Sequence, residues 1–233
     1  MVMSGLDRKE ELSRSLADVH ARIQEATAQA SRKRDEVTLI AVTKSYPISD
    51  VEILHQLGVT HFGENRSAEG LEKSSLVSAH WHFQGQIQSN KIAAISSWAH
   101  TVHSLDEISH VAKFDRAVGE IPEKRLNVFI QISLDGDTSR AGVRGDDLLA
   151  LAHSISSTKN LDLVGLMVVP PVQAEPEKAF SEVAEIAQRF RYEFPMAQSL
   201  SAGMSGDYEI AIAYGATHIR VGSQILGPRA THA

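Results

Sequence analysis

The chain lacks cysteine altogether: its 233 residues contain none. This absence excludes a disulfide framework, a thiolate metal site and a catalytic thiol. The chain also lacks any apolar run near the roughly 18 residues that span a bilayer, and its N-terminus is charged from Asp7 and Arg8 onward, unlike a signal peptide. We therefore expect no membrane partner and a cytoplasmic location.

Excess positive charge is absent as well. Lys and Arg number 23 against 29 Asp and Glu, for a net charge of −6, and no basic stripe runs along the chain. Proteins that bind nucleic acid carry such stripes, so the charge argues against a nucleic-acid partner. With 42% hydrophobic residues the chain can bury a large core, and no linker or change of composition divides residues 1–233 into more than one domain.

The first expected element is a helix. Apolar residues recur at spacings of three and four from Leu12 to Ala26, which gives one apolar stripe. This stripe predicts that a leading segment, residues 1–36, packs on the rest of the domain.

Short β-rich runs then alternate with amphipathic stretches. The expected strands are Thr38–Thr43, Thr60–Gly63, His80–Phe83, Thr101–Ser104, Leu126–Ser133, Leu163–Val169, Ser199–Ala202 and His218–Val221. The expected helices after them are Ser49–Leu57, Asn65–Ser74, Leu105–Ala117, Asp146–Ser157, Pro176–Phe190 and Asp207–Tyr214. Ser49 with Glu52 and Ser104 with Glu107 have the spacing of a helix capping box. Eight strands interleaved with helices predict an α/β fold with a single (β/α)₈ TIM-type barrel, and an open doubly wound sheet is the alternative.

Polar residues and glycines follow the expected strands. Since α/β barrels carry their active-site groups at the C-terminal ends of the strands, these residues should share one mouth of the barrel. They are Lys44, Gly63-Glu64-Asn65, Gly85, residues 137–142, Met167, Gly203 through Asp207, and Arg220 with Gly222-Ser223.

Two loops in this set have the character of a phosphate site. Barrels often bind phosphate after strands seven and eight, through backbone N–H groups and a helix N-terminus. Gly206 and Gly222 allow an anion close to the backbone, and Ser205 and Ser223 add hydroxyl donors. The alternative is that Ser205 only caps the helix that starts near Asp207. The occurrence of both loops at the expected place favours phosphate.

Lys44 and Arg220 are the charged residues of this mouth. Burial at a strand end lowers the pKa of an amine and makes it a nucleophile that can form a Schiff base, although most lysines at strand ends simply reach solvent. Strand alternation places Arg220 inside the barrel if Ile219 and Val221 face the helices. A buried guanidinium needs an acceptor, which is either a protein carboxylate or a ligand atom.

Two other signals carry less weight. His80 and His82 lie two residues apart on one strand without a third ligand nearby in the sequence, so we predict no metal site. Met167 and Met204 are residue types that usually fill core space.

The motifs of the chain nevertheless resemble a known family. They are Ala41-Val42-Thr43-Lys44, Phe62-Gly63-Glu64-Asn65, Trp81 through Lys91, Gly165-Leu166-Met167, Leu200 through Asp207, and Ile219-Arg220-Val221-Gly222-Ser223. In this order they look like the pyridoxal phosphate homeostasis protein family, whose fold is similar to the N-terminal barrel of alanine racemase. The resemblance extends from about Leu39 to Arg229 and includes the leading helix.

The resemblance implies pyridoxal 5′-phosphate (PLP) as cofactor, held as a Schiff base on Lys44. It implies that Ser205, Gly222 and Ser223 hold the phosphate and that Arg220 donates to the pyridine nitrogen. Asn65, His82, Met167 and Ser201 would line the pocket around the ring. The chain departs from the family pattern at Gln84, at Ala202 and at Arg140, where a lysine is usual.

An arginine beside the pyridine nitrogen disfavours ring protonation, so the cofactor becomes a poorer electron sink. Alanine racemase adds a second base from a C-terminal β-domain, which we do not expect in this chain. We therefore expect a monomeric carrier or regulator in PLP homeostasis with little or no catalysis, whose partners are PLP and either apo PLP-enzymes or amino acids. The alternatives are a small PLP enzyme such as an amino-acid racemase, and a PLP-free aldolase that uses Lys44.

Overall fold

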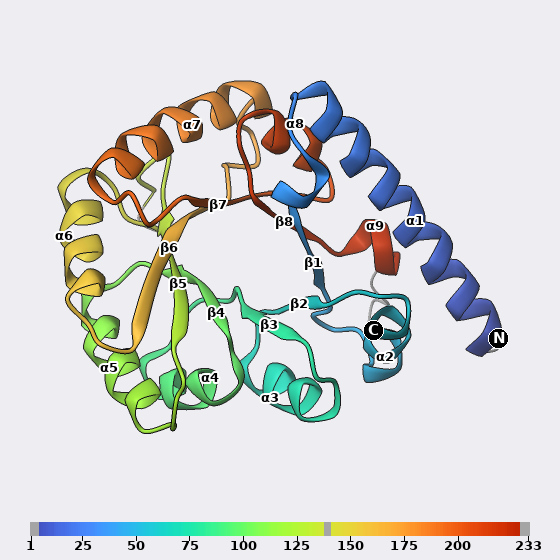
Figure 1. The fold of residues 1–233 in the computed structure, drawn as a ribbon, viewed down its shortest axis with the longest axis horizontal. Helices are drawn as coiled ribbons and strands as arrows, with labels where there is room; N and C mark the ends of the chain where they lie inside the picture. The colour runs from blue at the N-terminus through green and yellow to red at the C-terminus, as the bar shows by residue number, and fades with distance from the viewer. Residues whose placement is uncertain (1–4, 138–140, 229–233) are drawn as a thin grey trace.

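Eight parallel strands close into a barrel in sequence order, with β8 pairing back to β1 (Figure 1). The computed structural model describes residues 5–137 and 141–228. The strands are β1 (Thr38–Val42), β2 (His61–Glu64), β3 (His80–Phe83), β4 (Thr101–Leu105), β5 (Leu126–Ile132), β6 (Leu161–Val168), β7 (Ser199–Met204) and β8 (His218–Val221). The expected TIM-type barrel is confirmed, and its closure excludes the open sheet.

Helices cover the outside of this barrel (Figure 1). They are α1 (Gly5–Gln29), α2 (Ile48–Gln56), α3 (Ser67–Leu76), α4 (Ile92–Trp98), α5 (Ile108–Gly119), α6 (Gly145–Ser156), α7 (Pro176–Glu193), α8 (Tyr208–Ala213) and α9 (Ser223–Leu226), with 3₁₀ turns at Arg34–Glu36 and Ser89–Lys91. The sequence did not predict α4 or α9, because neither spans the 11 or so residues over which a helical period becomes visible. Among the described residues, no helix combines the length and apolar character that crossing a bilayer would need.

Both expected capping boxes are wrong. Helices α2 and α5 begin after Pro47 and Glu107, and neither start has a side-chain capping bond. Ser104 belongs to β4, and its hydroxyl donates to the Gly85 carbonyl oxygen at 2.5 Å. Ser104 is therefore a residue of strand β4 and does not cap the helix, although the pattern predicted that cap.

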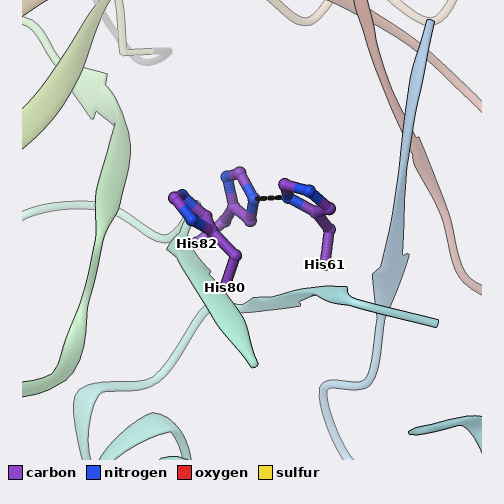
Figure 2. Close-up of side chains that lie close together, drawn as sticks. All are labelled: His61, His80 and His82. Atoms are coloured by element: carbon purple, nitrogen blue, oxygen red, sulfur yellow. Dashed lines mark hydrogen bonds between the residues drawn. The ribbon is translucent and has the colours of Figure 1, made fainter. Parts of the chain in front are cut away.

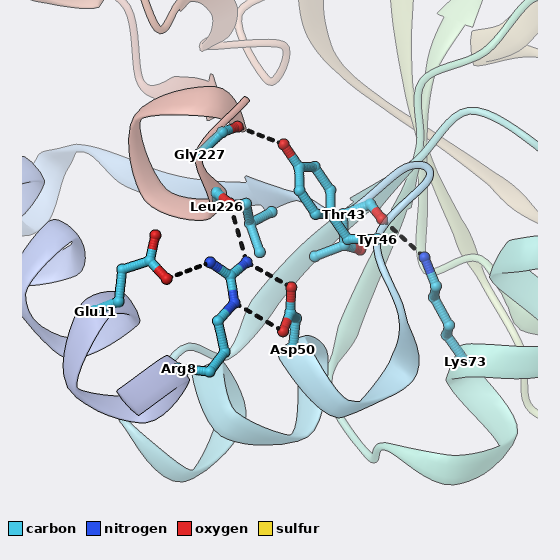
Figure 3. A network of polar contacts seen from close by, with 8 residues as sticks. All are labelled: Arg8, Glu11, Thr43, Tyr46, Asp50, Lys73, Leu226 and Gly227. Carbon is cyan, nitrogen blue, oxygen red and sulfur yellow. Dashed lines mark hydrogen bonds and ion pairs between the residues drawn. The ribbon is translucent and has the colours of Figure 1, made fainter. Parts of the chain in front are cut away.

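Helix α1 is bound to the barrel by one apolar stripe and by ion pairs from Arg8 to Asp50 on α2 and from Arg22 to Glu209 on α8. Its buried side chains include Leu12, Leu16, Val19 and Ile23, and the helix packs along α8 and α9 (Figure 1). Near its start, the guanidinium of Arg8 donates to both carboxylate oxygens of Asp50 on α2, at 3.1 and 2.6 Å, and to the carbonyl of Leu226 at 2.9 Å (Figure 3). The hydrogen bond to Asp50 raises the pKa of Arg8. Arg8 thus joins α1 both to α2, near the start of the barrel sequence, and to α9, near its end.

The two faces of the strands differ sharply in chemistry. The outward residues, such as Leu39 and Ala41 on β1 and Ile219 and Val221 on β8, belong to one apolar core under the helices. A fully buried Phe such as Phe114 in this layer contributes about 1.5–3 kcal/mol of burial. The inward face has histidines where most TIM barrels place branched apolar residues. Side chains of His61, His80, His82, His103 and His218 contact one another across the interior.

Candidate functional site

A cavity of about 450 Å³ opens at the C-terminal ends of the strands. It brings together seven of the residues predicted from the sequence: Lys44, Asn65, Met167, Ser205, Arg220, Gly222 and Ser223. Gly206 of the predicted phosphate loop also lines it, and Val42, Tyr46, Gln84, Val169 and Met204, which were not predicted as site residues, complete the lining. A larger groove, of about 720 Å³, lies outside the barrel beside Arg8, Glu72 and Pro228. We assign the site to the smaller cavity because it alone joins the ends of opposite strands.

Lys44 is the second residue after the end of β1 and is half-buried at the cavity wall. The chain turns sharply at the next residue, because Ser45 adopts a left-handed φ of 67°, an uncommon conformation for a non-glycine residue. The Ser45 N–H donates to a carboxylate oxygen of Glu69 at 3.0 Å, which holds the turn in place. Backbone of this kind persists only where its surroundings enforce it, so the direction of Lys44 is set by the fold.

A buried ion pair supports Lys44 from behind. Lys73 on α3 donates to Glu64 Oε1 at 2.6 Å and to the Thr43 carbonyl at 2.8 Å, and the Thr43 hydroxyl donates to the same Glu64 oxygen at 2.6 Å. Figure 3 shows the contact between Lys73 and Thr43. Burial raises the pKa of Glu64, while its bonds to Lys73 and Thr43 oppose that rise. The residue before Lys44 is therefore fixed through both its backbone and its side chain.

The sequence missed both members of this pair as functional residues. Glu64 stood in a motif at a strand end, which was a usable signal. Lys73 gave none, because a lysine within an amphipathic helix normally faces solvent.

The loops after β7 and β8 build another wall of the cavity. The Gly222 N–H donates to Ser205 Oγ at 3.3 Å, and the Gln224 side chain donates to the Ser205 carbonyl. A Cβ atom at Gly222 would lie 3.2 Å from the Val42 carbonyl oxygen, so a side chain there would crowd β1. Asp207, and not Ser205, is the N-cap residue of α8. The capping alternative for Ser205 is therefore wrong, and its hydroxyl stays beside the cavity.

Arg220 is buried in the floor of the cavity, 5% exposed. Its guanidinium donates to Ser201 Oγ at 2.8 Å and to the Val168 carbonyl at 2.9 Å. No carboxylate of the described ranges 5–137 and 141–228 forms an ion pair with it. Burial lowers its pKa to about 10, so the group is still a cation at neutral pH. Asp207 attracts this charge without forming an ion pair and opposes the fall in the pKa, whereas the oxygens that accept from the guanidinium are neutral, so a further acceptor in the cavity would stabilise it.

His82 and Ser201 do not line the cavity, although both were predicted to. Each is buried in the layer beneath it, and together with His103 they form a chain that ends on Arg220. His61 Nδ1 lies 3.0 Å from His82 Nε2, His82 Nδ1 lies 2.8 Å from His103 Nε2, and His103 Nδ1 lies 2.8 Å from Ser201 Oγ. These two residues therefore act on the cavity only through Arg220.

One direction of this chain satisfies every donor along it. Arg220 is always a donor, so Ser201 accepts from it, and in this direction Ser201 donates its own proton to His103 Nδ1. His103 then donates through Nε2 to His82, and His82 donates through Nε2 to His61. Burial lowers the pKa of His82 and of His103 well below the usual value, which keeps both rings neutral.

Asn65 is positioned by close packing. A Cβ atom at Gly85 would lie 1.9 Å from the Asn65 carbonyl oxygen, so only glycine allows the β3 turn to pass this close. Asn65 is thereby held at the cavity wall between Lys44 and Gln84.

Comparison with known proteins agrees with this geometry. The model of the alanine racemase N-terminal domain family matches residues 15–230. A pyridoxal phosphate homeostasis protein of Mycobacterium leprae is 40% identical over 95% of this chain and 94% of its own length, and one of Corynebacterium glutamicum is 41% identical over 91% and 99%. The chain belongs to the pyridoxal phosphate homeostasis protein family. The family resemblance predicted from the sequence is thus confirmed.

Two solved structures share this barrel at different levels of sequence identity. PipY of Synechococcus elongatus with PLP bound is similar with a TM-score of 0.77 and 32% identity, over 88% of this chain and 100% of that one. An alanine racemase of Corynebacterium glutamicum, at 13% identity, a TM-score of 0.68 and coverage of 93% and 60%, shares the fold alone.

Two departures from the homeostasis family's pattern can now be placed. Gln84 lines the cavity, so this departure touches the site itself. Ala202 lies in the apolar core under the helices, away from the cavity, and so leaves the site unchanged. Arg140 lies outside the described residues.

Proposed function

We propose that this protein binds PLP in the cavity at the C-terminal mouth, holds it as a Schiff base on Lys44, and acts as a carrier or regulator in PLP homeostasis. The link forms when the Lys44 amine condenses with the cofactor's aldehyde: a C=N bond replaces the carbonyl and one water leaves. Bound there, the cofactor would supply an aldehyde and an electron-accepting ring.

The observation that carries this proposal is the buried cation of Arg220. It lacks a carboxylate partner among the described residues, has further N–H groups beyond the two that Ser201 and Val168 occupy, and lines the same cavity as Lys44. A neutral pyridine nitrogen is an acceptor of the right kind, because it gains a hydrogen bond and brings no proton. Hydroxyls of Ser205 and Ser223 and the backbone around Gly222 suit the phosphate.

The same contacts argue against turnover. Arg220 disfavours protonation of the ring nitrogen, which weakens the ring as an electron sink. Tyr46 lines the cavity and carries a phenol hydroxyl that could exchange a proton. That hydroxyl donates to the Gly227 carbonyl at 2.5 Å (Figure 3). Within the described lining, no second acid–base group stands ready for proton transfer. The monomeric state, the cytoplasmic location and the apo-enzyme or amino-acid partners remain predictions from the sequence.

Reductive trapping tests the link. The protein is treated with borohydride after incubation with PLP, digested and mapped by mass spectrometry. We expect one reduced adduct on the peptide that contains Lys44, its loss in Lys44→Ala, and its retention in Lys178→Ala, which changes an exposed lysine on α7. An adduct that survives in Lys44→Ala would overturn the proposal.

Solvent exchange tests the lack of catalysis. The PLP-loaded protein is mixed with D- and L-amino acids in deuterated water, and exchange at the α-carbon is followed by NMR. We expect exchange no faster than with free PLP. Stereospecific exchange well above that rate would identify the protein as a small racemase-like enzyme.

A further inference from the structure

The N-terminal mouth of the barrel holds a second cluster of chemically capable residues, outside the cavity lining. His61 on β2 and His80 and His82 on β3 turn their rings inward and toward one another (Figure 2). His61 pairs with His80 across the strands, and alternation places His82 on the same inward face. One ring nitrogen from each of the three lies within 4.8 Å of the others. The sequence had shown only two of these ligands, since the third comes from the neighbouring strand.

We propose that His61, His80 and His82 bind one divalent transition-metal ion, with Zn²⁺ as the preferred ion. The cluster contains three imidazoles and no carboxylate, a ligand set that suits zinc, copper and nickel and disfavours calcium and magnesium. Three histidines with a fourth position open to water is an established zinc arrangement.

The distances need little adjustment to accept the ion. Two nitrogens bound to tetrahedral zinc at about 2.05 Å lie about 3.3 Å apart. His61 Nδ1 and His82 Nε2 are 3.0 Å apart, and a tetrahedral ion would lie beside the line that joins them. A nitrogen of His80 lies within 4.8 Å of both, so its ring must turn to bring that nitrogen to the ligating distance.

Outer contacts already hold the rings as ligands require. Ligating histidines almost always bond their second nitrogen to another protein group, which fixes the ring's orientation. His82 has His103 at 2.8 Å on its Nδ1 side, opposite the cluster, and Thr101 Oγ1 lies 2.9 Å from Nε2 of His80. Burial also lowers the pKa of all three histidines, to about 4 for His80, so the rings are in the neutral form that binds metal.

Access is open from this mouth. His61 and His80 are half-buried while His82 is buried, so an ion meets two partly accessible rings before the third. None of the three lines the cavity that contains Lys44. The ion therefore enters independently of any occupant of the opposite mouth.

Binding would reverse the hydrogen-bond chain above the cluster. The ion requires the lone pair of His82 Nε2, so the proton of that ring moves to Nδ1 and is donated to His103. His103 in turn donates through Nδ1 to Ser201, which then accepts from both His103 and Arg220. The metal site is thus connected to Arg220, in the floor of the cavity at the opposite mouth, by the positions of the protons along this chain.

The test uses the full chain, freed of metal with a chelator, and Zn²⁺ alone as probe. Competition with a chromogenic zinc chelator measures affinity and stoichiometry, and Co²⁺ replaces Zn²⁺ to report tetrahedral nitrogen ligation through its visible spectrum. We expect one ion per chain, a rise in the melting temperature, and at least a 100-fold weaker affinity in His61→Asn and in His80→Asn. His153→Gln, which changes a histidine on α6 outside the barrel, should bind like the parent.

Circular dichroism of each variant separates lost ligation from lost folding, and two ligand variants are included so that one misfolded chain does not decide the result. Absence of saturable binding by the parent would overturn the proposal. So would undiminished affinity in a folded His61→Asn or His80→Asn, or an equal loss in His153→Gln.

Discussion

The two mouths of this barrel both bury polar groups, but the C-terminal mouth keeps them charged and the N-terminal mouth keeps them neutral. Each buries polar groups within a closed sheet or directly against it. The C-terminal mouth keeps charge there: Arg220 is surrounded by dipoles, and Lys73 is paired with Glu64. The N-terminal mouth keeps polar rings without charge, because burial lowers the pKa of its histidines. A buried cation that lacks a counterion favours a ligand with an acceptor, whereas a cluster of neutral imidazoles favours a cation.

The comparison also explains why fold and function come from different residues. The outward strand residues and the helices form one apolar core, which suffices to specify a barrel. The inward residues contribute little to that core and differ from the branched apolar layers of other barrels. They are therefore available for binding chemistry at both mouths, with the chain from His61 to Arg220 joining the two ends.

Acid should lower the stability of the protein through the buried histidines inside the barrel, and this is the largest effect that we predict. The folded pKa of His82 and of His103 lies below the unfolded value, so between the two values the unfolded chain binds more protons and stability rises with pH. The stability is present above about pH 6.5 and is lost as pH falls toward the folded values. Because both rings stay neutral in the folded protein, the unfolding free energy should fall as the pH drops from 6.5 to 5.

Urea unfolding at a series of pH values measures this loss. His218→Asn removes a third inward ring, whose pKa burial lowers to about 4, and should give a shallower slope than the parent chain. A profile that stays flat from pH 6.5 to 5 would contradict neutral histidines in the barrel.

Removal of Lys73 should lower the stability of the protein by disrupting the ion pair at the C-terminal mouth. Lys73→Met leaves Glu64 buried without its partner, and we expect a loss of about 3 kcal/mol in urea unfolding. Arg125→Met, which removes the exposed pair between Arg125 and Asp162, is the matched control and should cost less than about 1 kcal/mol. Glu64→Gln added to Lys73→Met should recover part of the loss. Equal effects in the two single variants would mean that the buried pair does not support Lys44.

The sequence predicted one mouth well and the other poorly, and the reason is physical. Residues such as Lys44, Ser205 and Gly222 follow directly after strands, so strand order alone places them together. His61 and His80 are distant in the chain and meet only through the register of β2 with β3, which no local pattern reveals. Likewise, His82 and Ser201 were assigned to the pocket, but their depth along the strand puts them one layer below it.

Ser201→Ala should cut the connection between the mouths. Arg220 loses one acceptor and His103 loses its partner, which costs about 2 kcal/mol because the bond involves a charged donor. Ser97→Ala removes an exposed hydroxyl that bonds within α4 and should change stability by less than about 0.5 kcal/mol. Urea unfolding of both variants checks this, and equal stabilities would show that the chain to Arg220 carries no energetic weight.

The smallest effect should come from the rim of the C-terminal mouth. Ser223 is exposed at the cavity edge, so its hydroxyl can donate to a phosphate only in competition with water. We expect Ser223→Ala to raise the dissociation constant for PLP about fivefold, equivalent to about 1 kcal/mol, in an absorbance titration. Ser78→Ala, an exposed serine before β3 at the opposite mouth, should leave it unchanged. The position of the reductive adduct should stay on Lys44 in both variants, because neither substitution removes the amine. A Ser223→Ala chain with the parent affinity would place the phosphate on Ser205 and the backbone near Gly222 alone.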